Sequence, residues 1–125
     1  MTQNDSLDQF GKLFISAVRN QVHWKYRQIE NGSLRGENAK RRHETIDALA
    51  ASSEQKEKLR QIVEATIDDC LHEFLFMLEN NYDTLELVFK ASDGSVINVA
   101  ETSDGLCGEL NTEDGWIQKF GSHLD

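Results

Sequence analysis

A long apolar repeat between residues 59 and 78 constrains the fold of this chain more than any other feature. The repeat follows i, i+3, i+4 spacing at Leu59, Ile62, Val63, Thr66, Ile67, Cys70, Leu71, Phe74, Leu75 and Leu78. Such spacing places one side of an α-helix against a core. Ser52 and Gln55 precede the repeat in the spacing of a capping box, and Asn80-Asn81 suits a helix C-terminus. We therefore expect one long helix that begins after Ser52.

The last turns of this helix, residues 74–78, read Phe-Leu-Phe-Met-Leu and are apolar on every side. A helix that is apolar all round is expected to be covered all round. Two arrangements satisfy this expectation. The segment is either sandwiched between the other helices and the C-terminal half, or it lies in a dimer interface.

Two further helices are predicted in the first half of the chain. Ser6 is a candidate N-cap for the first helix, and the turn-forming residues 31–33 (Asn-Gly-Ser) separate it from a second helix over about 36–50. Apolar residues recur at helical spacing in the first, at Leu7, Phe10, Phe14, Ala17, Val18 and Ile29. In the second, the residues expected to face inward are Ala39, Ile46, Leu49 and Ala50.

A β-hairpin is predicted over residues 84–91 and 95–102, because both segments are strand-like and flank a Ser-Asp-Gly turn. A three-residue loop with Gly94 in the left-handed conformation would pair Phe89 with Ile97. We prefer this register to a two-residue loop because it gives one apolar face and avoids placing two glutamates opposite each other.

Residues 116–120 predict a further strand, and residues 106–110 a weaker one. The expected fold class is therefore α+β. Three N-terminal helices (residues 1–81) would pack on a small C-terminal antiparallel β-meander (residues 82–125), within a single domain over residues 1–125.

Composition bounds the function classes. The chain has 125 residues, two cysteines and 38% hydrophobic residues, and no apolar run approaches the roughly 20 residues of a membrane helix. Because the N-terminus is polar and the cysteines are too few for a disulfide framework, we expect a folded cytoplasmic protein without a membrane segment.

The charge is divided unequally along the chain. Residues 1–60 carry 11 Lys/Arg and 8 Asp/Glu, whereas residues 61–125 carry 2 Lys/Arg and 14 Asp/Glu. The cluster Lys40-Arg41-Arg42-His43 could contact phosphates, but the net charge of −9 opposes nucleic acid at longer range. We expect the basic helix to pair instead with the acidic half of its own fold or with a second copy.

No metal ion or cofactor is expected. At 100° per residue, His23 lies about 180° from Phe14 on its predicted helix, and His72 lies away from the apolar stripe. Ligands that point outward cannot converge in a core, and the acidic tail does not match a calcium-binding loop. The carboxylates on the long helix, which are Glu64, Asp68, Asp69 and Glu73, are interpreted as a solvated face, with Glu73 closest to the core.

Catalysis is not expected either, although it is not excluded. Cys107 is flanked by carboxylates, which raise the pKa of a thiol, and no nucleophile motif surrounds it. The alternative that stays open is a small enzyme, ligand-binding or cation-binding protein with its site in residues 103–116. A cleft that joins Cys107, Asp104, Glu109 and His43 would favour it.

The C-terminal part of the chain concentrates acidic residues on turns, where side chains can meet a partner. These are Asp93 on the predicted hairpin and Asp104, Glu109, Glu113 and Asp114 in the tail. An acidic surface of this kind attracts a basic protein and speeds its association. We therefore predict a small acidic protein-binding module, with these five residues facing a basic partner, and with a homodimer as a further possibility.

The tail also carries a resemblance. Residues 103–110 (Ser-Asp-Gly-Leu-Cys-Gly-Glu-Leu) followed by residues 113–117 (Glu-Asp-Gly-Trp-Ile) resemble a segment of small uncharacterised bacterial proteins. The short acidic chain, with helices before a hairpin, is similar in type to bacterial immunity proteins that neutralise toxins. This second resemblance implies an inhibitor that acts by binding another protein.

Overall fold

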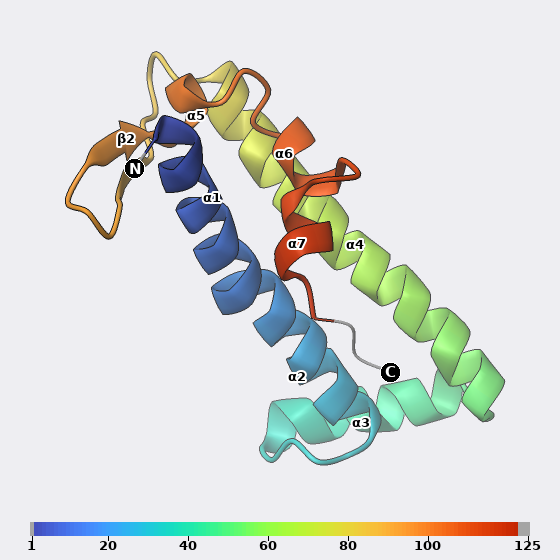
Figure 1. The fold of residues 1–125 in the computed structure, drawn as a ribbon. Helices are drawn as coiled ribbons and strands as arrows, with labels where there is room; N and C mark the ends of the chain where they lie inside the picture. The colour runs from blue at the N-terminus through green and yellow to red at the C-terminus, as the bar shows by residue number, and fades with distance from the viewer. Residues whose placement is uncertain (1, 123–125) are drawn as a thin grey trace.

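The computed structural model describes residues 2–122 and is mostly helical (Figure 1). The helices and strands, in chain order, are α1 (Gln3–Phe14), the π-helix η1 (Ile15–Arg19), α2 (Asn20–Glu30), α3 (Glu37–Leu49), α4 (Ser53–Asn80), β1 (Val88–Lys90), β2 (Val96–Asn98), α5 (Val99–Thr102), α6 (Gly108–Asn111) and α7 (Trp116–Phe120). The coarse prediction of an α+β fold agrees with this architecture, since the strands form one small antiparallel sheet.

Two long helical elements form the frame of the molecule. α1, η1 and α2 follow one another without a break and run antiparallel to α4, while α3 crosses the far end of both (Figure 1). The short helices α5, α6 and α7 lie along α1 and α4, at the end of the pair away from α3 (Figure 1). α7 packs on α1 and η1. Among the described residues, no helix is both long and apolar enough to cross a bilayer.

The predicted long helix is confirmed as α4. Its N-cap, Ser52, accepts a hydrogen bond from the Gln55 amide at 3.1 Å, and the Gln55 side chain accepts one from the Ser52 amide at 3.2 Å. This is the expected capping box. One face of the helix is buried through Leu71, Leu75 and Leu78.

The start predicted for the first helix is wrong. Thr2 is the N-cap, and it exchanges capping hydrogen bonds with Asp5. Ser6 lies inside the first turn, where its amide donates to the Thr2 carbonyl at 3.1 Å. Because Thr2 and Asp5 satisfy the first free amides, the helix begins one turn earlier than Ser6.

The hairpin register is confirmed. Phe89 pairs with Ile97, and Gly94 has a φ of +88°, the left-handed conformation expected of it. The Ala91 amide closes the three-residue loop by donating to the Ser95 carbonyl at 2.8 Å. The strands are shorter than predicted, because Asn98 caps a helical turn that turns the chain out of the sheet.

The other two predicted strands are wrong, because residues 106–110 and 116–120 form helical turns instead. Short apolar runs do not distinguish strand from helix by themselves. Trp116 is fully buried, and its ring meets that of Phe10 edge-on at 5.7 Å. A helical turn at this point lets Trp116 and its neighbour Ile117 pack into the core together, which the alternation of a strand would prevent.

Two apolar clusters lie at opposite ends of the helical pair. The larger one joins α1, α4, the hairpin and the C-terminal turns, and its largest fully buried side chains are Trp116, Ile15, Leu75, Leu106 and Leu110. The smaller one joins α2, α3 and α4 through Ile29, Ala39 and Ile46, with Tyr26, Leu34 and Leu59 around them. Between the two clusters, the helices are joined by polar and charged contacts.

The expectation that residues 74–78 are covered on every side is wrong for a single chain. Phe74, Phe76 and Met77 are 40%, 46% and 40% exposed. Leu75 and Leu78 alone face the core, since helices and strands pack on only part of the surface of α4. The sandwiched arrangement is therefore not formed within one chain, and the dimer interface stays a prediction.

The contact between Gly11 of α1 and Trp116 supports a stability prediction. A Cβ atom at Gly11 would lie 2.3–2.5 Å from the indole ring, so Gly11→Ala must displace Trp116. Alanine normally stabilises a helix relative to glycine by about 1 kcal/mol. We expect the opposite sign here, a loss of roughly 1–3 kcal/mol in urea unfolding.

Gly105→Ala is the matched control, because a Cβ atom at this position would meet no atom within 4 Å beyond its chain neighbours, and the φ of Gly105 is not positive. We expect it to change the free energy of unfolding by less than about 0.5 kcal/mol. A Gly11→Ala protein at least as stable as the wild type would contradict the packing of α7 on α1.

Candidate functional site

The structure brings together only two of the five acidic residues predicted to face a partner. Asp104 and Glu109 line one hollow of about 460 Å³, beside Asp8 of α1. Glu113 and Asp114 lie in the exposed turn that precedes α7, and neither lines this hollow. The predicted acidic binding face is therefore not one continuous site around the hollow.

Asp93 is held within its own turn. Its carboxylate accepts hydrogen bonds from the Ser95 hydroxyl at 2.6 Å and from the Ser95 amide at 2.9 Å. These two bonds lower the pKa of Asp93 below its usual value. The residue thus has a local structural role in the hairpin.

The cleft that would favour catalysis in the tail is not formed. Cys107 is half-buried and its sulfur lies 3.5 Å from Glu79 Oε2. Burial first, and the hydrogen bond to the Glu79 carboxylate second, raise the pKa of the Cys107 thiol. His43 lies on α3, where its Nδ1 is 2.9 Å from the Ile29 carbonyl, so it does not meet Cys107. Across residues 2–122, no three His, Cys, Asp or Glu side chains are grouped so that they could hold a metal ion.

A row of charged side chains joins η1 and α2 to α4 between the two apolar clusters. Arg19 contacts Asp68 through two nitrogens, at 2.8 Å and 3.1 Å. His23 lies between two carboxylates, with Nε2 3.0 Å from Asp68 Oδ1 and Nδ1 3.0 Å from Glu64 Oε2. Arg27 completes the row at 3.0 Å from Glu64 Oε1. We call these five residues the charge ladder.

The charge ladder corrects two predictions. His23 was expected to point outward, but it is only 4% exposed. The π-helix at residues 15–19 advances more slowly than 100° per residue, so it rotates the face that carries His23 towards α4. Glu64 and Asp68 were expected on a solvated face, but they are half-buried and pair with His23. Glu73, which was expected to lie closest to the core, is largely exposed.

Pairing also controls the protonation of Asp68. Burial alone would raise the pKa of Asp68, but hydrogen bonds from His23 and Arg19 outweigh it and hold the pKa below its usual value. Removing one partner of a half-buried ion pair is destabilising because it leaves the other charge unpaired. The ladder thus favours the alignment in which η1 and α2 face α4.

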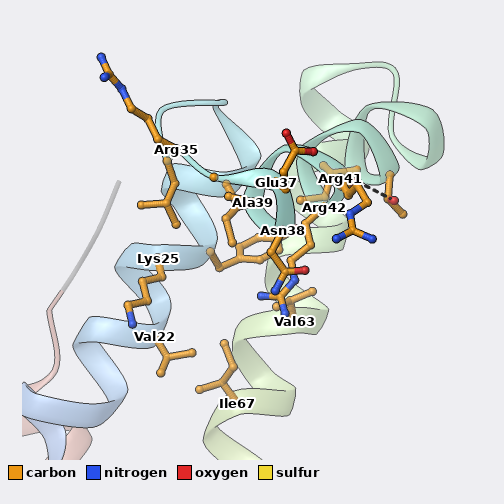
Figure 2. Close-up of a pocket in the computed structure, with 16 residues that line it drawn as sticks. Val22, Lys25, Arg35, Glu37, Asn38, Ala39, Arg41, Arg42, Val63 and Ile67 are labelled. Carbon is orange, nitrogen blue, oxygen red and sulfur yellow. Dashed lines mark hydrogen bonds between the residues drawn. The ribbon is translucent and has the colours of Figure 1, made fainter.

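A groove of about 860 Å³ lies beside the charge ladder, where α2, α3 and α4 meet. Figure 2 shows Val22 of α2 and Val63 and Ile67 of α4 at the space between the helices, with Asn38 and Arg42 extending towards it from α3. The groove is open to solvent along one side. Its apolar lining is contributed by Val22, Tyr26, Ile29, Leu34, Ala39, Ile46, Val63 and Ile67.

Four cations stand around this apolar lining, and we call Lys25, Arg35, Arg41 and Arg42 the basic rim. All four are exposed, and none is in an ion pair with a residue of the described range 2–122. Glu37 is the one carboxylate among the groove's described lining residues. The basic cluster was expected to pair either with the acidic half of the same chain or with a second copy. Arg41 and Arg42 form no such ion pair with the described residues.

The sequence contained part of the signal for this groove. The basic cluster at residues 40–43 was visible, but it was interpreted only as a phosphate contact or as one half of a charge pairing. The basic cluster lies beside apolar residues of α2 and α4 because α3 crosses these two helices. No local sequence pattern predicts that crossing.

Comparisons with known proteins add no identity. No protein-family model, no curated protein and no solved structure matches the chain. The resemblance of the tail to small bacterial proteins, and of the whole chain to immunity proteins, stays a prediction. Function is therefore argued from the geometry of the groove and its rim.

The charge ladder predicts how stability depends on pH. Because the pKa of Asp68 is lower in the folded protein than the usual value of about 4, the carboxylate stabilises the fold above that value. The contribution is lost as pH falls through the folded pKa. We expect Asp68→Asn to cost roughly 1–3 kcal/mol in urea unfolding at pH 6, and the difference from wild type to shrink below about pH 4.

Asp69→Asn is the matched control, since Asp69 is the exposed neighbour and forms no ion pair with the described residues. Its effect on unfolding is expected to stay within about 0.5 kcal/mol at both pH values. Equal losses of unfolding free energy for the two variants would show that the charge ladder does not stabilise the contact between α2 and α4.

Proposed function

We propose that this protein is a protein-binding module and that its docking site is the groove between α2, α3 and α4. Its ligand is an amphipathic helix with an acidic polar face, presented by a partner protein. One observation carries the proposal. Four cations that pair with no described residue surround an open apolar surface on a chain of net charge −9.

The shape of the site favours a helix over a small molecule. Sites for small ligands enclose most of the ligand surface, whereas this groove is open along one side. Its apolar surface also continues beyond the groove, since Phe14 and Phe74 stack at 5.8 Å and Val18 is 39% exposed. An amphipathic helix inserts side chains at i, i+3, i+4 and i+7 into an elongated surface of this kind.

The charge of the site favours an acidic partner. Exposed cations without an ion-pair partner attract opposite charge over several ångströms, so they steer an acidic partner towards the groove. The guanidinium groups of Arg35, Arg41 and Arg42 can bind carboxylates through two nitrogens at once. They would fix the orientation of the helix, while the apolar lining would provide most of the affinity.

A second candidate is the predicted binding of a basic partner to the acidic end. Asp104 supports it, because it lines one hollow with Asp8 and Glu109 and a second with Glu79 and Glu101. Three of these carboxylates already accept hydrogen bonds within the chain, Asp8 from Trp116, Glu109 from Ser103 and Glu79 from Cys107. Docking of the immunity type could use either surface, and the groove has the larger apolar area.

The first test is binding of a fluorescein-labelled helical peptide of about 16 residues, with leucine at i, i+3, i+4 and i+7 and glutamate elsewhere. Fluorescence anisotropy should show saturable binding that weakens with salt. The double variant Arg41→Glu/Arg42→Glu should weaken binding at least about tenfold, which is about 1.4 kcal/mol.

Lys58→Glu/Lys90→Glu is the matched control, because it changes the net charge equally at residues outside the groove lining. It should change affinity less than about threefold. A peptide with lysine in place of glutamate should not bind. If it bound better than the acidic peptide, and if charge reversal at Asp104 and Glu109 abolished that binding, the acidic end would be the docking site.

A further inference from the structure

We propose that a second copy of this chain is the helical partner of the groove, and that the two α4 helices pack antiparallel about Cys70. This inference rests on the proposed function and names its partner. It follows from a second apolar face on α4, from the length of that face and from the charge at its two ends.

The second face of α4 has the spacing of a helix–helix seam. Val63, Ile67, Cys70, Phe74 and Met77 are separated by four, three, four and three residues. This alternation is the heptad spacing by which helices pack side by side. No element of the described range 2–122 covers the seam, since Cys70, Phe74 and Met77 are exposed and Val63 and Ile67 line the groove.

The C-terminal turns do not cover this seam, because they lie on other sides of the helices. Cys107 contacts Glu79 of α4, and Cys70 lies about 180° from Glu79 around the helix. Asn20 of α2 donates to the Phe120 carbonyl, and Val22 lies about 200° from Asn20. The exposed apolar faces of α2 and α4 therefore both look away from α7.

The seam is nearly symmetric about its centre, because Ile67 and Phe74 lie three and four residues from Cys70, and the two end residues each lie seven residues away. Cys70 is the middle residue, and an antiparallel copy centred there sets Ile67 opposite Phe74 and Val63 opposite Met77. The seam spans about 21 Å along the helix axis. Each pair joins a smaller side chain to a larger one, which allows the two surfaces to interdigitate. Val18 and Val22 flank the seam and would pack on the same surface of the copy.

Charge selects the antiparallel direction. The last turn of α4 carries no basic residue, although the C-terminus of a helix carries partial negative charge. The exposed carboxylates Asp83 and Glu86 follow it. At the opposite end of the seam, α3 carries Arg41 and Arg42 of the basic rim. Antiparallel packing places each acidic end beside a basic rim, whereas parallel packing would bring like charges together.

The experiment is sedimentation equilibrium of the full chain over a concentration series, combined with thiol oxidation. We expect a mass twice the 14.2 kDa of one chain, with dissociation favoured by salt. In a Cys107→Ser background, mild oxidation should yield a covalent dimer, and Cys70→Ser should abolish it. Phe74→Glu should weaken dimerisation at least about tenfold.

Phe76→Glu is the matched control, since Phe76 is as exposed as Phe74 but lies on another side of α4. It should leave the dimer intact. Because Phe74 also stacks on Phe14, Cys70→Asp provides a second disruption at an exposed residue, and it too should yield a monomer. A dimer that survives Phe74→Glu and Cys70→Asp would overturn the proposed interface.

The proposed function is separable from this inference. A chain that stays monomeric up to about 100 μM, while it still binds the acidic peptide, would overturn the second copy as partner and leave the docking site standing. A monomer that binds no acidic peptide would overturn both. If both hold, the peptide should compete with the second copy and convert dimer to monomer.

Discussion

The charge ladder that joins η1 and α2 to α4 is the interaction on which the rest of the structure depends. The two apolar clusters lie at opposite ends of the helical pair, so the middle is joined by Arg19, His23 and Arg27 against Glu64 and Asp68. Misalignment of the helices would leave charges of the ladder half-buried and unpaired, which is destabilising. In the observed alignment, Val22 lines the same groove as Ile67, and Phe14 stacks on Phe74.

This arrangement covers one side of the helical pair and leaves the other open. On the covered side, Trp116 packs into the notch at Gly11 and ties the C-terminal turns to α1. On the open side, the apolar surface and its basic rim have no counterpart among the described residues of the chain. Exposed apolar surface rimmed by charge marks an interaction site more often than a structural fault, and both proposals start from this asymmetry.

Some expectations succeeded because their physical basis is local. The capping box of Ser52 and Gln55 and the loop ending at Gly94 are decided by atoms a few residues apart. The acidic face expected on α4 failed because its partners, Arg19 and His23, are more than 40 residues away. Full cover was wrongly expected for the all-apolar segment at residues 74–78, because composition alone does not reveal that three of its five side chains stay exposed in the single chain.

By itself, the sequence determined the long helix α4, its capping and the hairpin register, since hydrophobic period and turn chemistry act over short separations. It also determined that positive charge gathers at residues 40–43. Only the tertiary structure decided where these features meet. The π-helix turned His23 towards α4, Trp116 drew residues 116–120 into a helical turn, and the crossing of α3 placed the basic rim around an apolar groove. Contacts between distant segments made these choices, and no local pattern encodes them.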